Sequence, residues 1–238
     1  RNADIDSLAA RLTHGESLAQ ITENMKYYAY YLKAYTAVLG GFVGEYELET
    51  PDKSGAGKTV FVKKYGLKVF SPVAKGYYYS HYNDFGVSRS YGYDRKHLGN
   101  DLIGSVGTPI VAVEGGVVEA LGWNQYGGWR IGIRSFDGMR YYYYAHLRKN
   151  HPYVKTLVAG SIVKPGDVIG YLGMTGYSTR ENQNNIKTPH LHFGMQLIFD
   201  ESQKDGINQI WINVYHIVNF LENNRSAASY SAQTKDFV

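Results

Sequence analysis

The chain has 238 residues, a length that suits one large domain or one domain with a smaller appendage. Hydrophobic residues make up 44% of it and charged residues 19%. That is enough apolar surface to offset the entropy of ordering, so wholesale disorder is excluded. The formal charge of +4, from 25 basic and 21 acidic residues, is too small for a nucleic-acid-binding surface, and we expect no nucleic-acid partner.

Cysteine is absent from the chain, which excludes disulfide scaffolds, cysteine-based zinc sites and thiolate nucleophiles. Any bound metal must therefore be held by His, Asp or Glu. The chain begins at Arg1 without the hydrophobic core of a signal peptide. Whether a signal or a membrane anchor was removed upstream of Arg1 is left open.

The first 45 residues read as a helical N-terminal extension. Ser17 followed by Gln20 is a capping-box signature, and Gly40–Gly41 supplies a stop, which predicts a helix over residues 18–39. A shorter helix is expected over residues 5–13. The extension could pack on the body of the protein or dock a partner protein. Residues at spacings of three and four place one apolar stripe along the helix predicted over residues 18–39. They are Leu18, Ile21, Met25, Tyr28, Leu32, Tyr35 and Leu39.

From Tyr46 onward the pattern changes to short apolar or alternating runs separated by Gly, Pro or Asp, which is typical of an antiparallel β domain. Residues 135–138 carry Asp-Gly between two such runs and predict a hairpin turn. The predicted fold class is α+β, mostly antiparallel β. We expect a connector with a strand at 46–68, the β domain at 69–222 with a closing helix over 207–222, and a mobile polar tail at 223–238.

One glycine-rich motif is misleading. Residues 54–59 (Ser-Gly-Ala-Gly-Lys-Thr) resemble the end of a phosphate-binding loop, but Asp52 stands where the leading glycine should be. The segment also leads into a predicted strand, whereas a phosphate-binding loop must open a helix. Nucleotide binding is therefore rejected.

The histidines carry more information. His190 and His192 share one face of a predicted strand, with Cα atoms about 6.5–7 Å apart, so both rings can approach one ion. His97 and Asp101 would lie about 13 Å apart in an extended strand, too far for one metal ion, so the chain must bend between them. Gly99 is where that bend costs least. A carboxylate and two imidazoles with one open position can build a catalytic zinc site without cysteine.

These residues resemble a known family. His97-x-Gly-x-Asp101, Tyr144-Ala145-His146-Leu147 and Pro189-His190-Leu191-His192-Phe193 are similar in order and spacing to the motifs of lysostaphin-type (LytM-like) zinc endopeptidases of bacterial cell walls. The resemblance covers roughly residues 69–221 and implies a β-sheet catalytic domain. Further segments resemble the strands and turns of that family, at residues 107–112, 115–118, 122–128, 163–170 and 173–179.

The resemblance implies one Zn²⁺ per chain, with His97, Asp101 and His192 as ligands and with His146 and His190 as catalytic imidazoles. It also implies hydrolysis of peptide bonds in peptidoglycan, in the cross-bridge or the stem peptide, and hence an extracytoplasmic site of action. Zinc with one carboxylate ligand keeps net positive charge, which lowers the pKa of its water towards about 7. Imidazoles beyond the metal ligands can then orient or deprotonate that water.

Other candidates receive weaker roles. Tyr91 or Tyr93 could place a hydroxyl near the developing oxyanion. Tyr141–Tyr144 could line a substrate groove, although strand alternation allows at most half of these rings to do so. The charged stretch Asp94–Lys96 is interpreted as solvated. The polar insert Thr179–Thr188 should form a loop near the groove.

A second class of function is a catalytically idle relative that uses the same fold as a cell-envelope scaffold or binding module. Such relatives generally lack one or more of the five metal and catalytic residues, and all five are present here, which favours the enzyme. The bond that is cut and the oligomeric state are not fixed by the sequence. Glycine bridges, D-Ala–diaminopimelate links and stem peptides all stay open.

Overall fold

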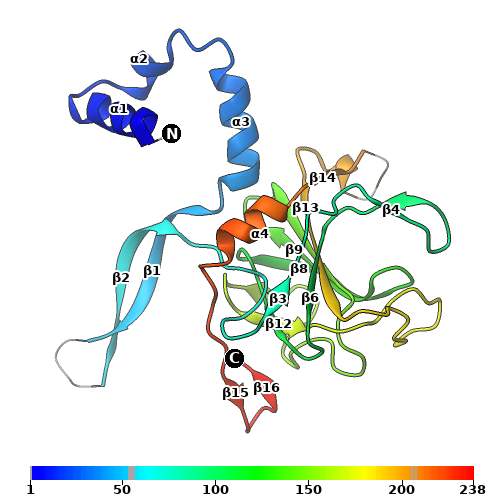
Figure 1. The fold of residues 1–238 in the computed structure, drawn as a ribbon. Helices are drawn as coiled ribbons and strands as arrows, with labels where there is room; N and C mark the ends of the chain where they lie inside the picture. The colour runs from blue at the N-terminus through cyan, green and yellow to red at the C-terminus, as the bar shows by residue number, and fades with distance from the viewer. Residues whose placement is uncertain (1, 53–56, 205, 207) are drawn as a thin grey trace. The chain divides into compact units, whose positions relative to one another are not determined.

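The computed structural model describes residues 2–52, 57–204, 206 and 208–238 (Figure 1). It divides into two compact units, one ending at Val38 and the other beginning at Leu39. The first unit is helical and the second contains every strand. Within the described residues, no helix has both the length and the apolar character that crossing a membrane requires.

The N-terminal unit contains three short helices, α1 (Asn2–Thr13), α2 (Leu18–Thr22) and α3 (Tyr28–Leu39). The capping box of Ser17 and Gln20 is present at the start of α2. The end of α3 at Leu39 agrees with the stop that Gly40–Gly41 predicted.

The prediction of a single helix over residues 18–39 is wrong. Between α2 and α3 the amide of Met25 donates to the carbonyl of Thr22, and the amide of Tyr28 donates to that of Met25, both at 2.9 Å. These three-residue turns replace the helical pattern. The physical reason is the lack of packing, because helices this short depend on burying their apolar face. Leu18, Met25 and Leu32 are about half exposed (53%, 53% and 50%).

The predicted connector at 46–68 is largely a hairpin. Strand β1 (Val43–Pro51) pairs antiparallel with β2 (Thr59–Leu67). Residues 54–56 of the glycine-rich motif lie outside the described residues. Thr59 begins a strand, as the argument against a phosphate-binding loop requires.

The largest sheet has eight antiparallel strands, in the order β11-β8-β9-β10-β13-β6-β3, with β14 paired to β13. It confirms the prediction of a mostly antiparallel β domain. Its strands are β3 (Tyr79–Ser80), β6 (Asn100–Gly104), β8 (Gly116–Asn124), β9 (Gly128–Ser135), β10 (Arg140–Ala145), β11 (Ile162–Val163), β13 (His190–Leu197) and β14 (Ile210–Ile212). Three two-stranded sheets join β4 (Ser88–Arg89) to β5 (Arg95–Lys96), β7 (Pro109–Val111) to β12 (Val168–Tyr171), and β15 (Tyr230–Ser231) to β16 (Asp236–Phe237).

The β9–β10 hairpin shows how alternation separates the core from the exposed face of the sheet. Its turn is the predicted one, closed by the amide of Gly138 donating to the carbonyl of Ser135 at 2.9 Å. On β10, Tyr142 and Tyr144 are fully buried and pack on Phe193 of β13. Tyr141 and Tyr143 point to the opposite face of the sheet.

The predicted closing helix over residues 207–222 is only partly correct. Residues 210–212 form strand β14, in which Trp211 pairs with Gln196 of β13. The isoleucines of this segment favour a strand on an available sheet edge. The amide of Tyr215 donates to the side chain of Asn213 at 3.0 Å, and helix α4 (Tyr215–Leu221) follows. A short 3₁₀ turn lies before β14, at Glu201–Gln203.

Residues 223–238 were expected to be a mobile tail, and within them residues 230–237 form the β15–β16 hairpin. Asp236, only 4% exposed, anchors it. Its carboxylate accepts hydrogen bonds from His151 at 2.7 Å, from the hydroxyl of Tyr171 at 2.8 Å and from the amide of Lys155 at 3.0 Å. A buried carboxylate with three donors is a specific anchor that the polar composition of the tail does not reveal.

Candidate metal centre

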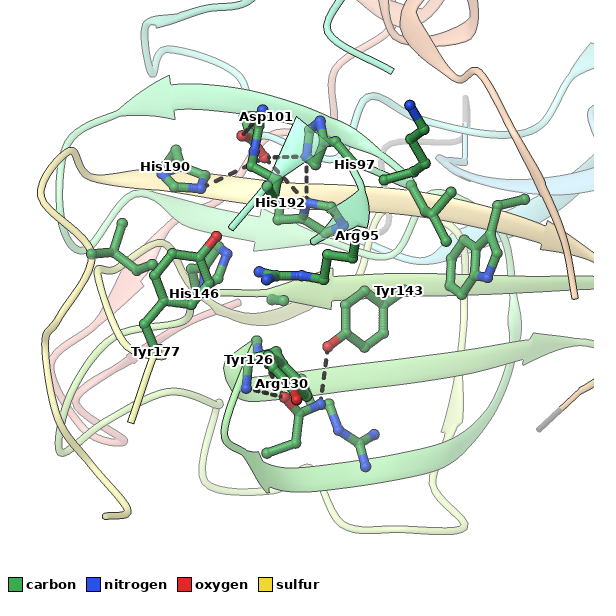
Figure 2. A pocket seen from close by; sticks show the side chains of 18 of the residues that line it. Arg95, His97, Asp101, Tyr126, Arg130, Tyr143, His146, Tyr177, His190 and His192 are labelled. Atoms are coloured by element: carbon green, nitrogen blue, oxygen red, sulfur yellow. Dashed lines mark hydrogen bonds and ion pairs between the residues drawn. The ribbon is translucent and has the colours of Figure 1, made fainter. Parts of the chain in front are cut away.

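The five candidate site residues meet at three neighbouring strands of the large sheet, three of them on the strands and two in the adjoining links. Asp101 on β6 lies directly opposite His192 on β13, and His190 shares the face of His192 two residues earlier. His146 follows the last residue of β10, which is paired with β13. His97 lies in the short link between β5 and β6. Figure 2 shows the five side chains converging at one end of a cleft.

Three donor atoms form a tight triangle. Nε2 of His97 lies 2.9 Å from Oδ1 of Asp101 and 2.9 Å from Nδ1 of His192, and the latter two atoms are 3.1 Å apart. These residues form a group that could hold a metal ion. Tetrahedral zinc with ligands at about 2.0–2.2 Å needs donors about 3.4 Å apart. The triangle has to open by only a few tenths of an ångström, so the residues fit a zinc ion.

Gly99 lets the chain bend tightly enough to bring His97 and Asp101 together. A Cβ atom at this position would lie 2.7 Å from Cε1 and Nε2 of His192 and 2.7 Å from the carbonyl oxygen of Phe193. Such distances are far inside van der Waals contact. The bend predicted at Gly99 is present, and glycine is needed there because β13 approaches the backbone so closely.

A second set of side chains holds the metal-site residues. Nδ1 of His97 donates to the carbonyl of Asp84 at 3.2 Å and lies 3.1 Å from its carboxylate. Arg89 donates to Asp84 at 2.7 Å and to Oδ2 of Asp101 at 3.2 Å. Asp101 therefore has Oδ1 directed to the donor triangle and Oδ2 held by Arg89. Outer partners of this kind orient metal ligands and fix their tautomers.

The sequence analysis missed Asp84 and Arg89. Neither belongs to a motif with fixed spacing, because both reach the site through the fold of the segment before β5. The one signal available was chemical: a metal-binding imidazole usually donates its other N–H to an acceptor. That rule calls for a partner to His97 but does not select Asp84.

The surroundings favour an ionised carboxylate on Asp101 and a neutral imidazole on His192. Burial acts to raise the pKa of Asp101, but hydrogen bonds from His192 and His97 outweigh it, and the pKa lies far below its usual range. Burial lowers the pKa of His192, against the opposing effect of Asp101. An anionic carboxylate beside unprotonated imidazoles is the protonation state in which these groups bind a divalent cation.

His146 and His190 stand beside the donor triangle and are fixed by backbone carbonyls. Nδ1 of His146 donates to the carbonyl of Thr175, and Nδ1 of His190 donates to that of Thr188, both at 2.8 Å. The two rings are 4.8 Å apart, and Nε2 of His190 is 3.6 Å from Oδ1 of Asp101. A neutral imidazole whose Nδ1 carries the proton has an unprotonated Nε2.

The backbone and the surroundings of His146 are unusual. Its φ of 61° is in the left-handed region, which a residue other than glycine seldom adopts. Burial, followed by the neighbouring His190 and His192, lowers its pKa well below the usual value. His146 is therefore a neutral imidazole at neutral pH, able to accept a proton.

The five residues lie at one end of a cleft of about 830 Å³. Tyr141 and Tyr143 line it, as strand alternation predicted, and so do residues 185–188 of the polar insert. Tyr91 and Tyr93 are not among the lining residues. Tyr91 instead stacks on Tyr177, which lines the cleft, at a centroid distance of 4.6 Å.

The interpretation of Asp94–Lys96 as merely solvated is wrong for Arg95. This side chain is only partly exposed and lines the cleft. Its guanidinium stacks on Tyr126 and Tyr177, with the central carbon 5.1 Å and 5.2 Å from the two ring centroids. Charge runs are usually solvated, and the contact arises here because β5 is paired and directs Arg95 inward.

Comparison with known proteins identifies the class. Residues 95–206 match the model of peptidase family M23. For these residues the match confirms the predicted resemblance to lysostaphin-type peptidases.

Individual relatives are consistent with the family. The L-Ala–D-Glu endopeptidase of Bacillus subtilis is 42% identical over 117 residues, which cover 49% of this chain and 34% of the relative. Lysostaphin of Staphylococcus simulans is 40% identical over 98 residues, covering 41% of this chain and 17% of the relative. The chain spans about a third or less of the length of these curated relatives.

A solved structure supports the fold. The crystal structure of a LytM-type protein from Ruminococcus gnavus, described as a candidate glycyl-glycine endopeptidase, superposes with a TM-score of 0.56 at 31% identity. The match covers 69% of this chain and 64% of the other. The predicted lysostaphin/LytM-like β-sheet domain is thereby confirmed.

Proposed function

We propose that the chain is a zinc-dependent endopeptidase that hydrolyses peptide bonds in bacterial peptidoglycan. The observation that carries the proposal is the donor triangle of His97, Asp101 and His192, with the imidazoles of His146 and His190 beside it at the end of an open cleft. The relatives named as endopeptidases support the same reaction. Peptidoglycan lies outside the cytoplasm, so the proposed site of action is extracytoplasmic.

The metal would be held by Nε2 of His97, Oδ1 of Asp101 and Nδ1 of His192. When bound there, Zn²⁺ supplies a Lewis acid that polarises a carbonyl oxygen and lowers the pKa of water. The chain prepares the site by keeping Asp101 ionised and by aligning it through Arg89. The three residues leave the cleft side open to substrate.

His146 is proposed as the general base. Its Nδ1 is committed to the carbonyl of Thr175, so Nε2 is the atom that takes a proton from the attacking water and returns one to the leaving amine. The lowered pKa keeps this ring unprotonated at neutral pH. His190 is held in the same tautomer by Thr188 and is proposed to orient the water from beside Asp101.

The test is to separate metal binding from turnover. The chain, purified without chelators, should contain close to one zinc and release peptides from purified peptidoglycan. His192→Ala should lose metal and activity together because it removes a ligand. His146→Ala should retain the metal and lose at least about 100-fold in turnover, the usual scale of general-base catalysis. Metal content by mass spectrometry and muropeptide analysis provide the two readouts.

A wild-type chain without zinc and without peptide release would instead favour the scaffold function. Equal loss of metal in both variants would contradict the separate roles assigned to His192 and His146.

A further inference from the structure

The cleft carries a surplus of positive charge. Asp101 is its sole acidic lining residue among those the structure describes. Arg89 is paired with Asp101 and Asp84, and Lys204 is paired with Glu119 at 2.7 Å. The remaining basic lining residues have no ion-pair partner among the described residues, and they are Arg95, Lys96, Arg130 and Lys187.

Arg95 is the most constrained of these unpaired cations. It lies between the rings of Tyr126 and Tyr177, and its Nη1 donates to the carbonyl of Tyr91 at 2.9 Å. Contact with two aromatic rings, together with this hydrogen bond, restrains the guanidinium. The other N–H groups of the guanidinium have no acceptor among the described residues. Arg95 is therefore a restrained cation whose remaining N–H groups are available to a ligand.

Arg95 is also close to the proposed catalytic groups. The ring of Tyr177, on which it stacks, is 5.9 Å from the ring of His146. Figure 2 shows the guanidinium directed towards Tyr177 and His146 from beneath the donor triangle. A group bound by Arg95 would thus lie in the same part of the cleft as His146.

The chemistry of the guanidinium selects the ligand. Its planar array of N–H groups matches a carboxylate with two parallel hydrogen bonds. A partly buried cation without a counter-ion is costly, and a bound anion would relieve that cost. Arg130 on β9 is a further unpaired cation that lines the cleft. Its Nε is buried without a hydrogen-bond partner in the described residues.

We propose that Arg95 is a carboxylate-binding residue of the cleft, and that the peptides cut here carry a free carboxylate beside the scissile bond. A glutamyl residue in a stem peptide fits this requirement, whereas a neutral glycine bridge does not. The inference rests on the proposed endopeptidase function and deepens it by naming the substrate class.

The test uses three synthetic peptides and four proteins. The peptides are an L-Ala–D-Glu peptide with its side carboxyl free, the same peptide with that carboxyl amidated, and a glycine pentapeptide blocked at both ends. The proteins are the wild type, Arg95→Gln, Arg95→Lys and the control Arg180→Gln, whose exposed arginine lies outside the cleft. Cleavage is followed by chromatography, and binding is measured by calorimetry on the same samples.

The wild type should bind the free carboxyl peptide roughly 10- to 100-fold more tightly than the amidated one, the scale of a charge-assisted hydrogen-bond pair. Arg95→Gln should abolish this preference, so that the free and the amidated peptides bind equally. Arg95→Lys should keep part of the preference, since it retains the charge without the planar array, and Arg180→Gln should behave as the wild type.

Equal binding of the free and amidated peptides by the wild type, or an equal loss for all peptides in Arg95→Gln, would overturn the inference. Carboxylate-selective binding through Arg95 without cleavage of any peptide or of peptidoglycan would uphold it and contradict the proposed function. Cleavage without a preference for the free carboxyl peptide would support the proposed function and overturn the inference about Arg95.

Discussion

The charged groups that line the cleft fall into two sets. In the first set each group is paired: Asp101 with Arg89 and the imidazoles, and Arg89 with Asp84 as well. In the second set, which includes Arg95 and Lys187, the side chains have no ionic partner in the described part of the chain. Paired charges fix positions, whereas unpaired charges are available to a ligand. The contrast assigns the chemistry to the paired set and substrate selection to the unpaired set.

A large effect on zinc affinity is expected from a change that adds only one methyl group. Gly99→Ala would place Cβ 2.7 Å from the ring of His192 and from the backbone of β13. Overpacking of this kind costs about 1–3 kcal/mol, and displacing His192 should weaken zinc binding by about 10- to 100-fold. Competition with a zinc chelator measures the affinity.

The matched control is Gly66→Ala, where the nearest atom to the added Cβ is 4.0 Å away on Tyr46. Its zinc affinity should equal that of the wild type. Unchanged zinc affinity in Gly99→Ala would mean that the approach of β13 to Gly99 does not position the ligand.

A smaller effect is expected from Arg89→Gln. This change removes the donor to Oδ2 of Asp101 and leaves the buried carboxylate of Asp84 without its cation. Zinc affinity should fall by about 10-fold, as when an outer partner of a ligand is lost. Lys187→Gln, which removes an unpaired cation of the cleft, should leave the zinc affinity unchanged. A fall of similar size in both variants would show that overall charge, and not the paired contact, matters.

The pH dependence of stability should report on His146. Its pKa is lowered in the folded state, so below about pH 6.5 the unfolded chain binds more protons than the native chain. This contribution to stability is present above that pH and is lost as the pH falls towards the folded-state pKa. In metal-free protein, the Tm should decline between about pH 6.5 and 5 more steeply for the wild type than for His146→Gln. Parallel curves would mean that His146 does not have a lowered pKa.

The smallest effect is expected on peptide binding when Lys187, an exposed cation of the cleft, is replaced. Lys187→Gln removes an exposed charge that is fixed by no ring contact or side-chain hydrogen bond among the described residues. Peptide binding should weaken by less than about 3-fold, and the difference should vanish at high salt because exposed charges are screened. A large loss that persists in salt would make Lys187 a specific contact comparable to Arg95.

The sequence was most informative where chemistry requires fixed spacing. His190 and His192 fall on one strand face by the two-residue period, and Gly99 marks the bend that brings Asp101 to them. The antiparallel sheet and the hairpin at residues 135–138 were predicted for similar local reasons. In each case the signal lies within a few residues of the feature.

The failures have a common physical cause, because they depend on contacts between distant segments. The stripe over residues 18–39 has helical periodicity, but periodicity does not reveal whether a surface exists to cover it. Asp236 and Arg95 have unremarkable neighbours in the chain, and only the fold brings Asp236 to Tyr171 and Arg95 to Tyr177.

The central claim is that three side chains from separate stretches of the chain bind one zinc ion. Crystals of the zinc-loaded chain, measured at the zinc absorption edge, test it directly. The account predicts a single strong anomalous peak about 2.0–2.2 Å from Nε2 of His97, a carboxylate oxygen of Asp101 and Nδ1 of His192. A peak elsewhere, or one bound by His146 and His190 without Asp101, would contradict it.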